Sequence, residues 1–347
     1  MSNQPPIEVP QGAIRLNTDS QKLEFFAQDR WYEMATDSPL LAESGLGDVS
    51  LGARGIFGTG TTPGTTDFIG FINIASNGNE QDFGNAVAQA HGASAGLSSR
   101  TRGIFAGGQQ SSPYNEIHFV TIAQKGDSID FGDLTRGTRF AMGSSNQTRG
   151  IIAGGMDQPS DNRVNTTEFV TIASTGNALD FGDLTVARAQ AAGVSNGTRG
   201  IHSCGQSPTK VNVIDFFMIA TLGNAMDFGD ATTFTDSQAS GCNAIRGIFA
   251  GGSPAGDDDQ KVIQFITMAT LGNATNFGEL SVQRTSAAGV SSPTRSVFAG
   301  GYTNPGSTHT TTIDYINNMS EGNAVDFGDQ SVNRDQMGSF SNAHGGL

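Results

Sequence analysis

A repeat of about 48 residues is the feature that most constrains how this chain can fold. A string of the form Arg-Gly-Ile-Phe-Ala-Gly-Gly recurs at spacings of 48, 47, 50, 47 and 49 residues, with its arginine at Arg54, Arg102, Arg149, Arg199, Arg246 and Arg295. A second string, Asp-Phe-Gly-Asp-Leu, recurs in phase with it, with its phenylalanine at Phe83, Phe131, Phe181, Phe228, Phe277 and Phe327. Two independent markers therefore predict six structural units over residues 50–345.

Each unit reads as four short strands. In one unit, residues 167–173 and 179–184 are the expected third and fourth strands, and residues 187–194 and 199–204 are the expected first and second strands of the next unit. The third strand is apolar on both faces, which is typical of a strand that is covered on both sides. Since each blade of a propeller is flanked by two others, the sequence predicts an all-β, six-bladed propeller.

The end of the chain predicts how this propeller closes. The segment from Arg334 to Phe340 matches a first strand and nothing further, whereas the first unit has no convincing first strand before Arg54. We therefore expect residues 332–342 to complete the first blade, which would remove an exposed sheet edge. Residues 46–347 are then one closed domain.

The repeat resembles the kelch repeat. The matching features are an arginine at the start of the first strand (Arg188, Arg284, Arg334), a run of small residues, and a Gly-Gly pair that ends the second strand. The phenylalanine of Asp-Phe-Gly replaces the usual tryptophan of the last strand, and the usual tyrosine is mostly missing. The resemblance therefore implies a kelch-like propeller with a divergent repeat.

Residues 1–45 are expected to form a separate β-hairpin module. Ile14 and Leu16 alternate with Arg15, a polar turn follows, and residues 22–26 and Trp31 mark two further strands. Three such short strands cannot hold a stable core alone, so the module is expected to pack in an oligomer or on a partner. The expected assembly contacts are Arg15, Phe25, Phe26, Trp31 and Tyr32.

The module's pattern, Gly-Ala-Ile-Arg-Leu-Asn-Thr-Asp followed by Leu-Glu, an aromatic residue and a tryptophan, resembles a motif of tail-fibre and other virion proteins of tailed bacteriophages. Structural proteins of cyanobacterial phages are similar in both the hairpin and the repeats. This resemblance implies a non-enzymatic virion protein of a tail fibre, neck or other surface appendage, made in the host cytoplasm. It further implies other virion proteins as partners of the N-terminal module, a symmetric homo-oligomer in the particle, and a host-surface receptor or glycan as a ligand. The alternative is a propeller that binds proteins or glycans outside a virion.

The net charge and the scattered cysteines and histidines argue against several other functions. The formal net charge of −14 disfavours nucleic acid and anionic membranes as partners. No apolar run approaches the roughly 20 residues of a membrane helix, so no membrane insertion is expected. Cys204 and Cys242 are expected to be free thiols, and the five histidines show no metal-type spacing. We expect no catalytic residues, no metal and no cofactor, because an enzyme would need converging titratable groups at the propeller axis and the sequence nominates none.

Any ligand is expected on the loops between the second and third strands, which are the most irregular part of the repeat. The candidate residues in these loops are Tyr114, Asp257, Asp258, Asp259, Tyr302 and His309. The recurring arginine of the second strand and the aspartate of Asp-Phe-Gly are expected near one face, where they could pair between strands or blades.

Overall fold

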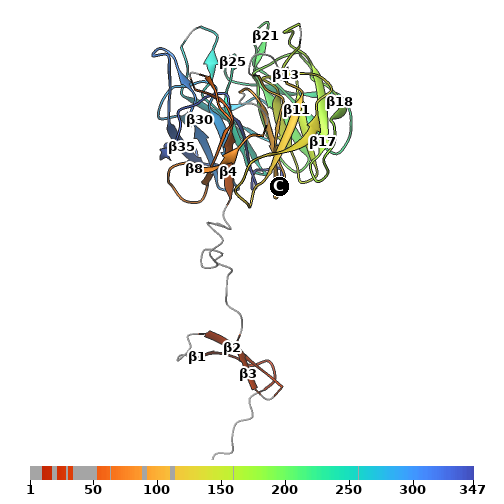
Figure 1. Ribbon diagram of the computed structural model, residues 1–347. Helices are drawn as coiled ribbons and strands as arrows, with labels where there is room; N and C mark the ends of the chain where they lie inside the picture. Colours follow the sequence, from red (N-terminus) through yellow and green to blue (C-terminus); the bar gives the residue numbers. More distant parts are fainter. Residues whose placement is uncertain are drawn as a thin grey trace, which may run out of the picture. The chain divides into compact units, whose positions relative to one another are not determined.

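The computed structural model describes residues 10–17, 22–28, 30–33, 53–62, 64–87, 92–109, 114–158, 160–256 and 258–347. The chain divides into two compact units, residues 1–51 and 52–347. The boundary predicted after residue 45 lies outside the described residues. Every regular element of the described segments is a β-strand (Figure 1), and these segments contain no helix able to cross a membrane.

The N-terminal unit contains one antiparallel sheet of three strands, β1 (Ile14–Asn17), β2 (Lys22–Ala27) and β3 (Arg30–Glu33), in the order β1-β2-β3. On one face Phe25 stacks on Tyr32 with ring centroids 5.5 Å apart, beside Ile14 and Leu16, whose side chains are 63% and 60% exposed. The strand alternation that the sequence predicted is therefore confirmed, and it leaves an apolar surface on this face.

The other face of this sheet is held together by charge and aromatic contacts. The Arg15 guanidinium lies 4.1 Å from the Trp31 ring centroid, and its Nε donates to Glu24 Oε2 at 2.7 Å. Phe26 packs edge-on against Trp31 at 5.3 Å. Arg15, Phe26 and Trp31 thus contact one another within the unit, whereas Phe25 and Tyr32 belong to the apolar face.

The second unit is built from six antiparallel sheets of four strands. The first sheet is β37 (Gly338–Ser341), β4 (Arg54–Gly58), β7 (Phe68–Asn73) and β8 (Gln81–Asn85); the second is β9 (Ala95–Ser98), β10 (Arg102–Ala106), β11 (Glu116–Thr121) and β12 (Ile129–Asp133); the third is β14 (Met142–Ser145), β15 (Arg149–Ala153), β17 (Thr166–Thr171) and β18 (Leu179–Asp183). The fourth is β19 (Ala192–Ser195), β20 (Arg199–Ser203), β23 (Val213–Met218) and β24 (Met226–Asp230); the fifth is β26 (Ala239–Cys242), β27 (Arg246–Ala250), β29 (Val262–Thr267) and β30 (Thr275–Glu279); the sixth is β31 (Ala288–Ser291), β32 (Arg295–Ala299), β35 (Thr312–Asn317) and β36 (Val325–Asp329).

Short two-stranded pairs lie in the loops at one end of these sheets, which we call the loop face. They are β5 (Thr61–Thr62) with β6 (Gly64–Thr65), β13 (Thr138–Arg139) with β16 (Met156–Asp157), β21 (Gln206–Ser207) with β22 (Thr209–Lys210), β25 (Thr235–Asp236) with β28 (Ser253–Pro254), and β33 (Tyr302–Thr303) with β34 (Thr308–His309). In Figure 1, β13, β21 and β25 lie at the top of this unit and the C-terminus lies at the opposite end.

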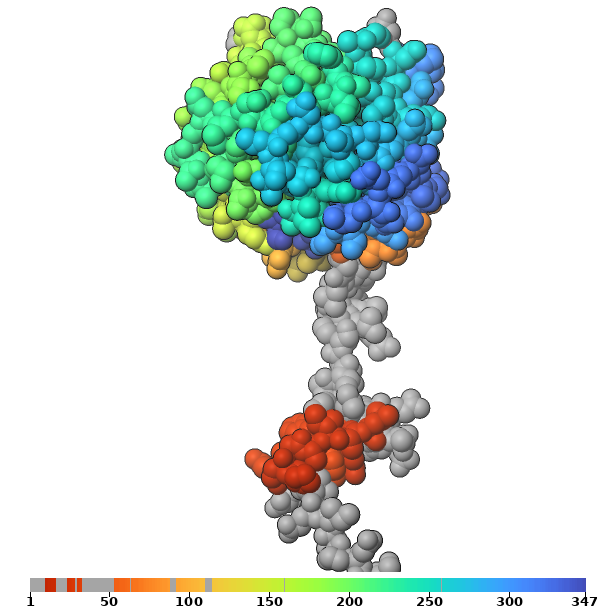
Figure 2. Space-filling view, turned by 180° about the vertical axis from the view of Figure 1, so that it is seen from behind, coloured from red at the N-terminus to blue at the C-terminus, as the bar shows by residue number. Residues whose placement is uncertain are grey.

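The first strands of the six sheets contact one another in cyclic order. β9 lies beside β14, β14 beside β19, β19 beside β26, β26 beside β31, β31 beside β37, and β37 beside β9. The predicted pairing of the C-terminal segment is confirmed, because β37 pairs antiparallel with β4, with Phe340 opposite Ile56. Figure 2 shows the green to blue fourth, fifth and sixth sheets side by side, with the orange first sheet next to the sixth. This arrangement is consistent with a β-propeller.

The first strands begin later than the sequence predicted. The range 187–194 was expected to be one strand, whereas β19 starts at Ala192. Gln190 has a φ of 58°, in the left-handed region, which interrupts an extended strand. The side chain of Arg188 is fully buried and points back into the fourth sheet, where its Nη2 lies 2.5 Å from Asp215 Oδ1.

The Asp-Phe-Gly motif of each fourth strand binds a turn of the next sheet. This turn joins the third and fourth strands of that sheet and has the sequence Gly-Asn or Gly-Asp. The main-chain N–H of Gly176 donates to the carbonyl of Phe131 in the preceding sheet at 2.8 Å, and Asn177 Oδ1 accepts from the N–H of Asp133 at 3.1 Å. A Cβ on Gly132, whose φ is 145°, would come within 2.6 Å of Gly176, so only glycine fits there. The same pair of contacts recurs at all six boundaries, including that between the sixth and first sheets.

The arginine of each second strand also joins neighbouring sheets, but its partner is not the aspartate that the sequence suggested. Arg149 Nη1 donates to the carbonyl of Ile219 in the next sheet at 2.7 Å, and its guanidinium lies 4.5 Å from the ring centroid of Phe169 in its own sheet. The equivalent donors and acceptors are Arg54 to Ile122, Arg102 to Ile172, Arg199 to Met268, Arg246 to Asn318 and Arg295 to Ala75. Because the acceptor is a main-chain carbonyl, this contact between sheets does not depend on which side chain the next sheet carries at that position.

Histidine replaces an apolar residue in the core of the fourth sheet. Phe57, Phe105, Ile152, Phe249 and Phe298 occupy this position in the other sheets, and here it is His202, which is fully buried and packs edge-on against Phe217. Neither ring nitrogen has a hydrogen-bond partner among the described residues. Burial therefore lowers the pKa of His202 from 6.5 to about 4.

Replacing His202 by phenylalanine is expected to make the protein less sensitive to acid. The unfolded chain binds a proton at this side chain below pH 6.5 and the folded chain only below about pH 4, so folding stability falls as the pH drops through this window. His202→Phe should therefore gain about 2 kcal/mol over the parent protein on going from pH 8 to pH 5. Urea unfolding at both pH values measures this gain. The prediction is contradicted if the free energies of unfolding of the two proteins differ by the same amount at pH 8 and at pH 5.

Candidate functional site

Each of the six first strands pairs with a second strand along one edge. The other edge of each first strand faces a common axis. The space between them is a cavity of about 160 Å³ lined mostly by residues of the six first strands, many of them small, such as Gly96, Gly143, Gly193 and Gly289. Because these strands lie so close together, a Cβ on Gly143 would come within 2.0 Å of the Gly96 carbonyl oxygen. The cavity therefore has room for water or a small molecule and little else.

A ring of hydroxyl groups surrounds one end of this axis. Ser145 Oγ donates to the carbonyl of Ser98 at 2.9 Å, Ser195 Oγ to the carbonyl of Ser145 at 2.7 Å, and Ser98 Oγ to the carbonyl of Ser341 at 2.8 Å. Cys242 takes the same place in the fifth sheet, where its Sγ lies 3.2 Å from the carbonyl of Ser195. Cys242 and Cys204 are both free thiols, as expected from the sequence, and both are buried.

The last residues of the chain cover this end of the axis. His344 Nε2 lies 3.3 Å from both Ser145 Oγ and the Ser98 carbonyl oxygen. A Cβ on Gly346 would approach the Ser145 carbonyl oxygen to 2.0 Å, and one on Gly345 would approach the Asn243 carbonyl oxygen to 2.2 Å, so two glycines let the tail lie flat against the ring. The axis is accordingly covered at this end and must be approached from the loop face.

A second ring, made of main-chain hydrogen bonds, surrounds the axis at the loop face. Phe140 N–H donates to the Ala93 carbonyl at 2.9 Å, Gln190 N–H to Phe140 at 3.0 Å, and Ser237 N–H to Gln190 at 2.7 Å; the ring continues through Ser286 and Gln336 back to Ala93. All six residues have φ between 53° and 63°, and none is glycine. We call these six residues the mouth ring.

The mouth ring lines a second cavity of about 100 Å³. The residues that line it are the six members of the mouth ring and the residue that follows each of them in the chain, such as Gln238 after Ser237. None of the residues described as lining it bears a formal charge. The lining residues thus include one aromatic residue, amides and hydroxyls, and the Arg139 guanidinium lies 5.5 Å from the Phe140 ring centroid.

Sequence reasoning did not find the mouth ring. Its members in the second to sixth sheets lie nine residues before the repeated arginine, so their positions are in phase with the repeat. Their residue types share no chemistry, because the ring is made by main-chain atoms. The only available signal was therefore the position within the repeat.

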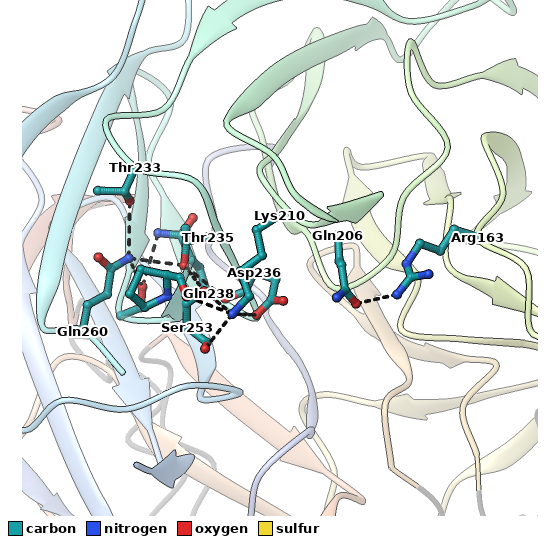
Figure 3. A network of polar contacts seen from close by, with 11 residues as sticks. Arg163, Gln206, Lys210, Thr233, Thr235, Asp236, Gln238, Ser253 and Gln260 are labelled. Atoms are coloured by element: carbon teal, nitrogen blue, oxygen red, sulfur yellow. Dashed lines mark hydrogen bonds and ion pairs between the residues drawn. The ribbon is translucent and has the colours of Figure 1, made fainter. Parts of the chain in front are cut away.

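Outside the mouth, a polar network cross-links neighbouring sheets on the loop face (Figure 3). Lys210 Nζ donates to the Ser253 carbonyl and Oγ at 2.9 and 2.7 Å and lies 3.6 Å from Asp236 Oδ1, and Arg163 Nη2 donates to Gln206 Oε1 at 2.6 Å. Burial raises the pKa of the Asp236 carboxyl, and the Lys210 ammonium opposes that rise. These contacts join the loops of the third, fourth and fifth sheets.

Two of the predicted ligand residues meet in the sixth sheet. The ring of Tyr302 packs edge-on against His309 with centroids 5.5 Å apart, and His309 Nε2 lies 3.5 Å from Asp335 Oδ1, which also accepts from Thr61 Oγ1. Burial raises the pKa of Asp335, and the hydrogen bond from Thr61 and the charge of His309 oppose that rise. These two residues therefore join the sixth sheet to the first.

The other predicted ligand residues are separated. Asp259 is buried and accepts from the N–H of Asn304 at 2.6 Å, whereas Asp258 is exposed and Asp257 lies outside the described residues. Tyr114 is half-buried in the loop just before β11, and burial raises its pKa. Within the described residues, no three His, Cys, Asp or Glu side chains gather in a group that could hold a metal ion.

No family model matches the chain, and no curated protein matches it significantly.

Proposed function

We propose that the six sheets are the blades of a closed six-bladed, kelch-like propeller, and that the chain is a non-enzymatic virion structural protein of a tail fibre, neck or other surface appendage. It attaches through its N-terminal module and displays the propeller, which carries the host-surface contact. The cyclic order of the first strands and the mouth ring support the closed propeller. The motif resemblance of residues 12–34 supports the virion role.

The observation that carries the attachment role is the apolar face of the three-stranded sheet. Ile14 and Leu16 are each about two-thirds exposed beside the stacked rings of Phe25 and Tyr32. A small sheet with an uncovered apolar face gains stability by burying it against another protein or another copy of itself. The six-sheet unit, in contrast, pairs its own last strand with its first sheet.

Removing residues 1–45 is expected to leave a folded six-sheet unit that no longer joins the particle. The sheet β1-β2-β3 supplies the proposed attachment surface, while residues 52–347 form a compact unit of their own. Thermal melting of the purified truncated protein checks folding, and its copy number per particle checks attachment. The matched variant Ile14→Ser with Leu16→Ser, which changes only the exposed apolar face, should also reduce incorporation; full incorporation of both variants would contradict attachment through this module.

The alternative is a protein- or glycan-binding propeller outside a virion. The neutral cavity at the mouth ring favours it, because a concave site with converging polar groups is the usual form of a small-ligand site. The two functions differ in where the protein is found: the first predicts symmetric oligomers in purified particles, and the second predicts a monomer that is absent from them.

A further inference from the structure

The turns that join the first and second strands of the second to sixth sheets share one geometry. Each begins with a side-chain oxygen that accepts a hydrogen bond from the main-chain N–H of the repeated arginine three residues later. These first residues are Ser99, Asn146, Asn196, Asn243 and Ser292. The residues that follow them are Arg100, Gln147, Gly197, Ala244 and Pro293. Since proline has no N–H, and glutamine and alanine also fit, the turn needs neither a glycine nor an N–H at this second position.

The turn of the fourth sheet therefore has a glycine for which the fold gives no reason. Gly197 is exposed, and a Cβ built on it would meet no atom within 4 Å. Its N–H donates no hydrogen bond within the described part of the chain. The main-chain nitrogen after Asn196 is thus both unbound and unshielded, which leaves it available as a nucleophile.

The side chain of Asn196 is held in a position that favours attack by this nitrogen. Its Oδ1 accepts from the N–H and the Oγ1 of Thr198, both at 3.0 Å, and from the N–H of Arg199 at 2.8 Å. The bond to the N–H two residues ahead curls the side chain over the Asn196–Gly197 peptide bond. The three donors also surround the oxygen on which negative charge develops when a nucleophile adds to the amide carbon.

We propose that Asn196 is a site of spontaneous deamidation. The Gly197 nitrogen loses its proton to water and bonds to Asn196 Cγ, while the bond from Cγ to Nδ2 breaks and Nδ2 leaves as ammonia. Water then opens the resulting succinimide at one of its two carbonyls, which leaves aspartate or isoaspartate at position 196. The reaction uses only this chain and water, and the inference is independent of the virion role proposed above.

Two other asparagines each carry one half of this arrangement. Asn146 has the same three donors, from Thr148 N–H at 3.0 Å, Thr148 Oγ1 at 3.2 Å and Arg149 N–H at 2.9 Å, but the side chain of Gln147 crowds the nitrogen that would attack. Asn77 precedes the other Asn-Gly glycine of the sequence. There, the N–H of Gly78 is bound to the Phe327 carbonyl at 2.9 Å in the joint between the sixth and first sheets.

The two products should affect the fold differently. An aspartate at position 196 keeps the oxygen acceptor of the turn and adds one negative charge. An isoaspartate adds a methylene group to the main chain of the turn, where the Gly197 carbonyl accepts from Asn146 Nδ2 at 3.3 Å. Formation of isoaspartate should therefore disturb a contact between the third and fourth sheets.

Peptide mapping by mass spectrometry tests the proposal on the purified full-length protein, incubated at pH 8 and 37 °C. Asn196 should convert at a rate at least about tenfold above the rates of Asn77 and Asn146, which corresponds to 1.4 kcal/mol of activation free energy. Labelling by an isoaspartyl methyltransferase should locate isoaspartate at the same position, because only the succinimide route produces it.

Two variants exchange the turn sequences of the third and fourth sheets. Gly197→Gln gives the fourth sheet the Asn-Gln-Thr-Arg turn of the third sheet and should lower the rate at Asn196 to that of Asn146. Gln147→Gly makes the reverse change and should raise the rate at Asn146 at least about tenfold. Each variant copies a turn already present in the fold, and thermal melting checks that both are folded. Equal rates at the three asparagines of the parent, conversion without isoaspartate, or no gain in Gln147→Gly would overturn the proposal.

Discussion

Deleting residues 331–347 is expected to abolish cooperative folding of the six-sheet unit at 25 °C. The deletion removes β37, and with it the inner strand of the first sheet and one member of each ring around the axis. It also removes Phe340, whose ring packs 4.8 Å from that of Phe105, and it leaves Glu80 buried without Arg334. Loss of a buried phenylalanine and of one partner of a buried ion pair each costs about 3–5 kcal/mol, which together approach the 5–15 kcal/mol that stabilises a typical protein.

A shorter deletion is the control for this effect. Removing residues 343–347 takes away the tail over the hydroxyl ring but leaves β37 and Arg334 in place. Calorimetry should therefore show a single transition for this variant at a temperature close to that of the parent. Equal stability of the longer deletion and the parent would refute the idea that β37 completes the fold.

Breaking the buried ion pair of the sixth sheet is expected to destabilise the protein strongly. The side chains of Arg284 and Asp314 are completely buried, with Nη2 and Oδ2 3.0 Å apart. Arg284→Thr leaves the Asp314 carboxylate with Ser281 and no counter-ion, and it should lower the free energy of unfolding by about 3–5 kcal/mol. Chemical denaturation at pH 7.5 measures the loss.

The fifth sheet supplies the rescue for this substitution. There, Thr235 stands where the sixth sheet has Arg284, and Gln264 stands where it has Asp314, with Gln264 Oε1 accepting from Thr232 at 2.8 and 2.9 Å. The double variant Arg284→Thr with Asp314→Gln reproduces this neutral arrangement and should recover at least half of the lost stability. A double variant as unstable as the single one would show that charge burial is not the cause.

The architecture was largely predictable because the repeat is long and doubly marked. Two strings in phase predict six units, and the unpaired match from Arg334 to Phe340 predicts the partner of the strand that begins at Arg54. The joints between sheets were not predictable in the same way. Periodicity shows that the Phe of Asp-Phe-Gly and the Gly-Asn turn recur together, but it carries no information that each binds the other across a sheet boundary.

The candidate site was harder to predict from the sequence. Irregular loops suggested Tyr302, His309 and Asp259, and the structure shows these side chains, or the loops they belong to, bound to neighbouring sheets. The mouth ring was not predictable from the sequence, because it is defined by φ and by main-chain hydrogen bonds. Residue types such as Phe140 and Gln190 give no sign of either.

The pairing of β37 with β4 also bears on how the chain is made in the cell. Arg54 leaves the ribosome 284 residues before Gly338, which at about 5–20 residues per second is a delay of tens of seconds. Throughout translation, the open edge of β4, with its apolar Ile56 and Phe57, has no inner strand to pair with. An unpaired strand edge is a template for pairing with another chain, so the time that translation takes sets how long nascent chains are exposed to such pairing.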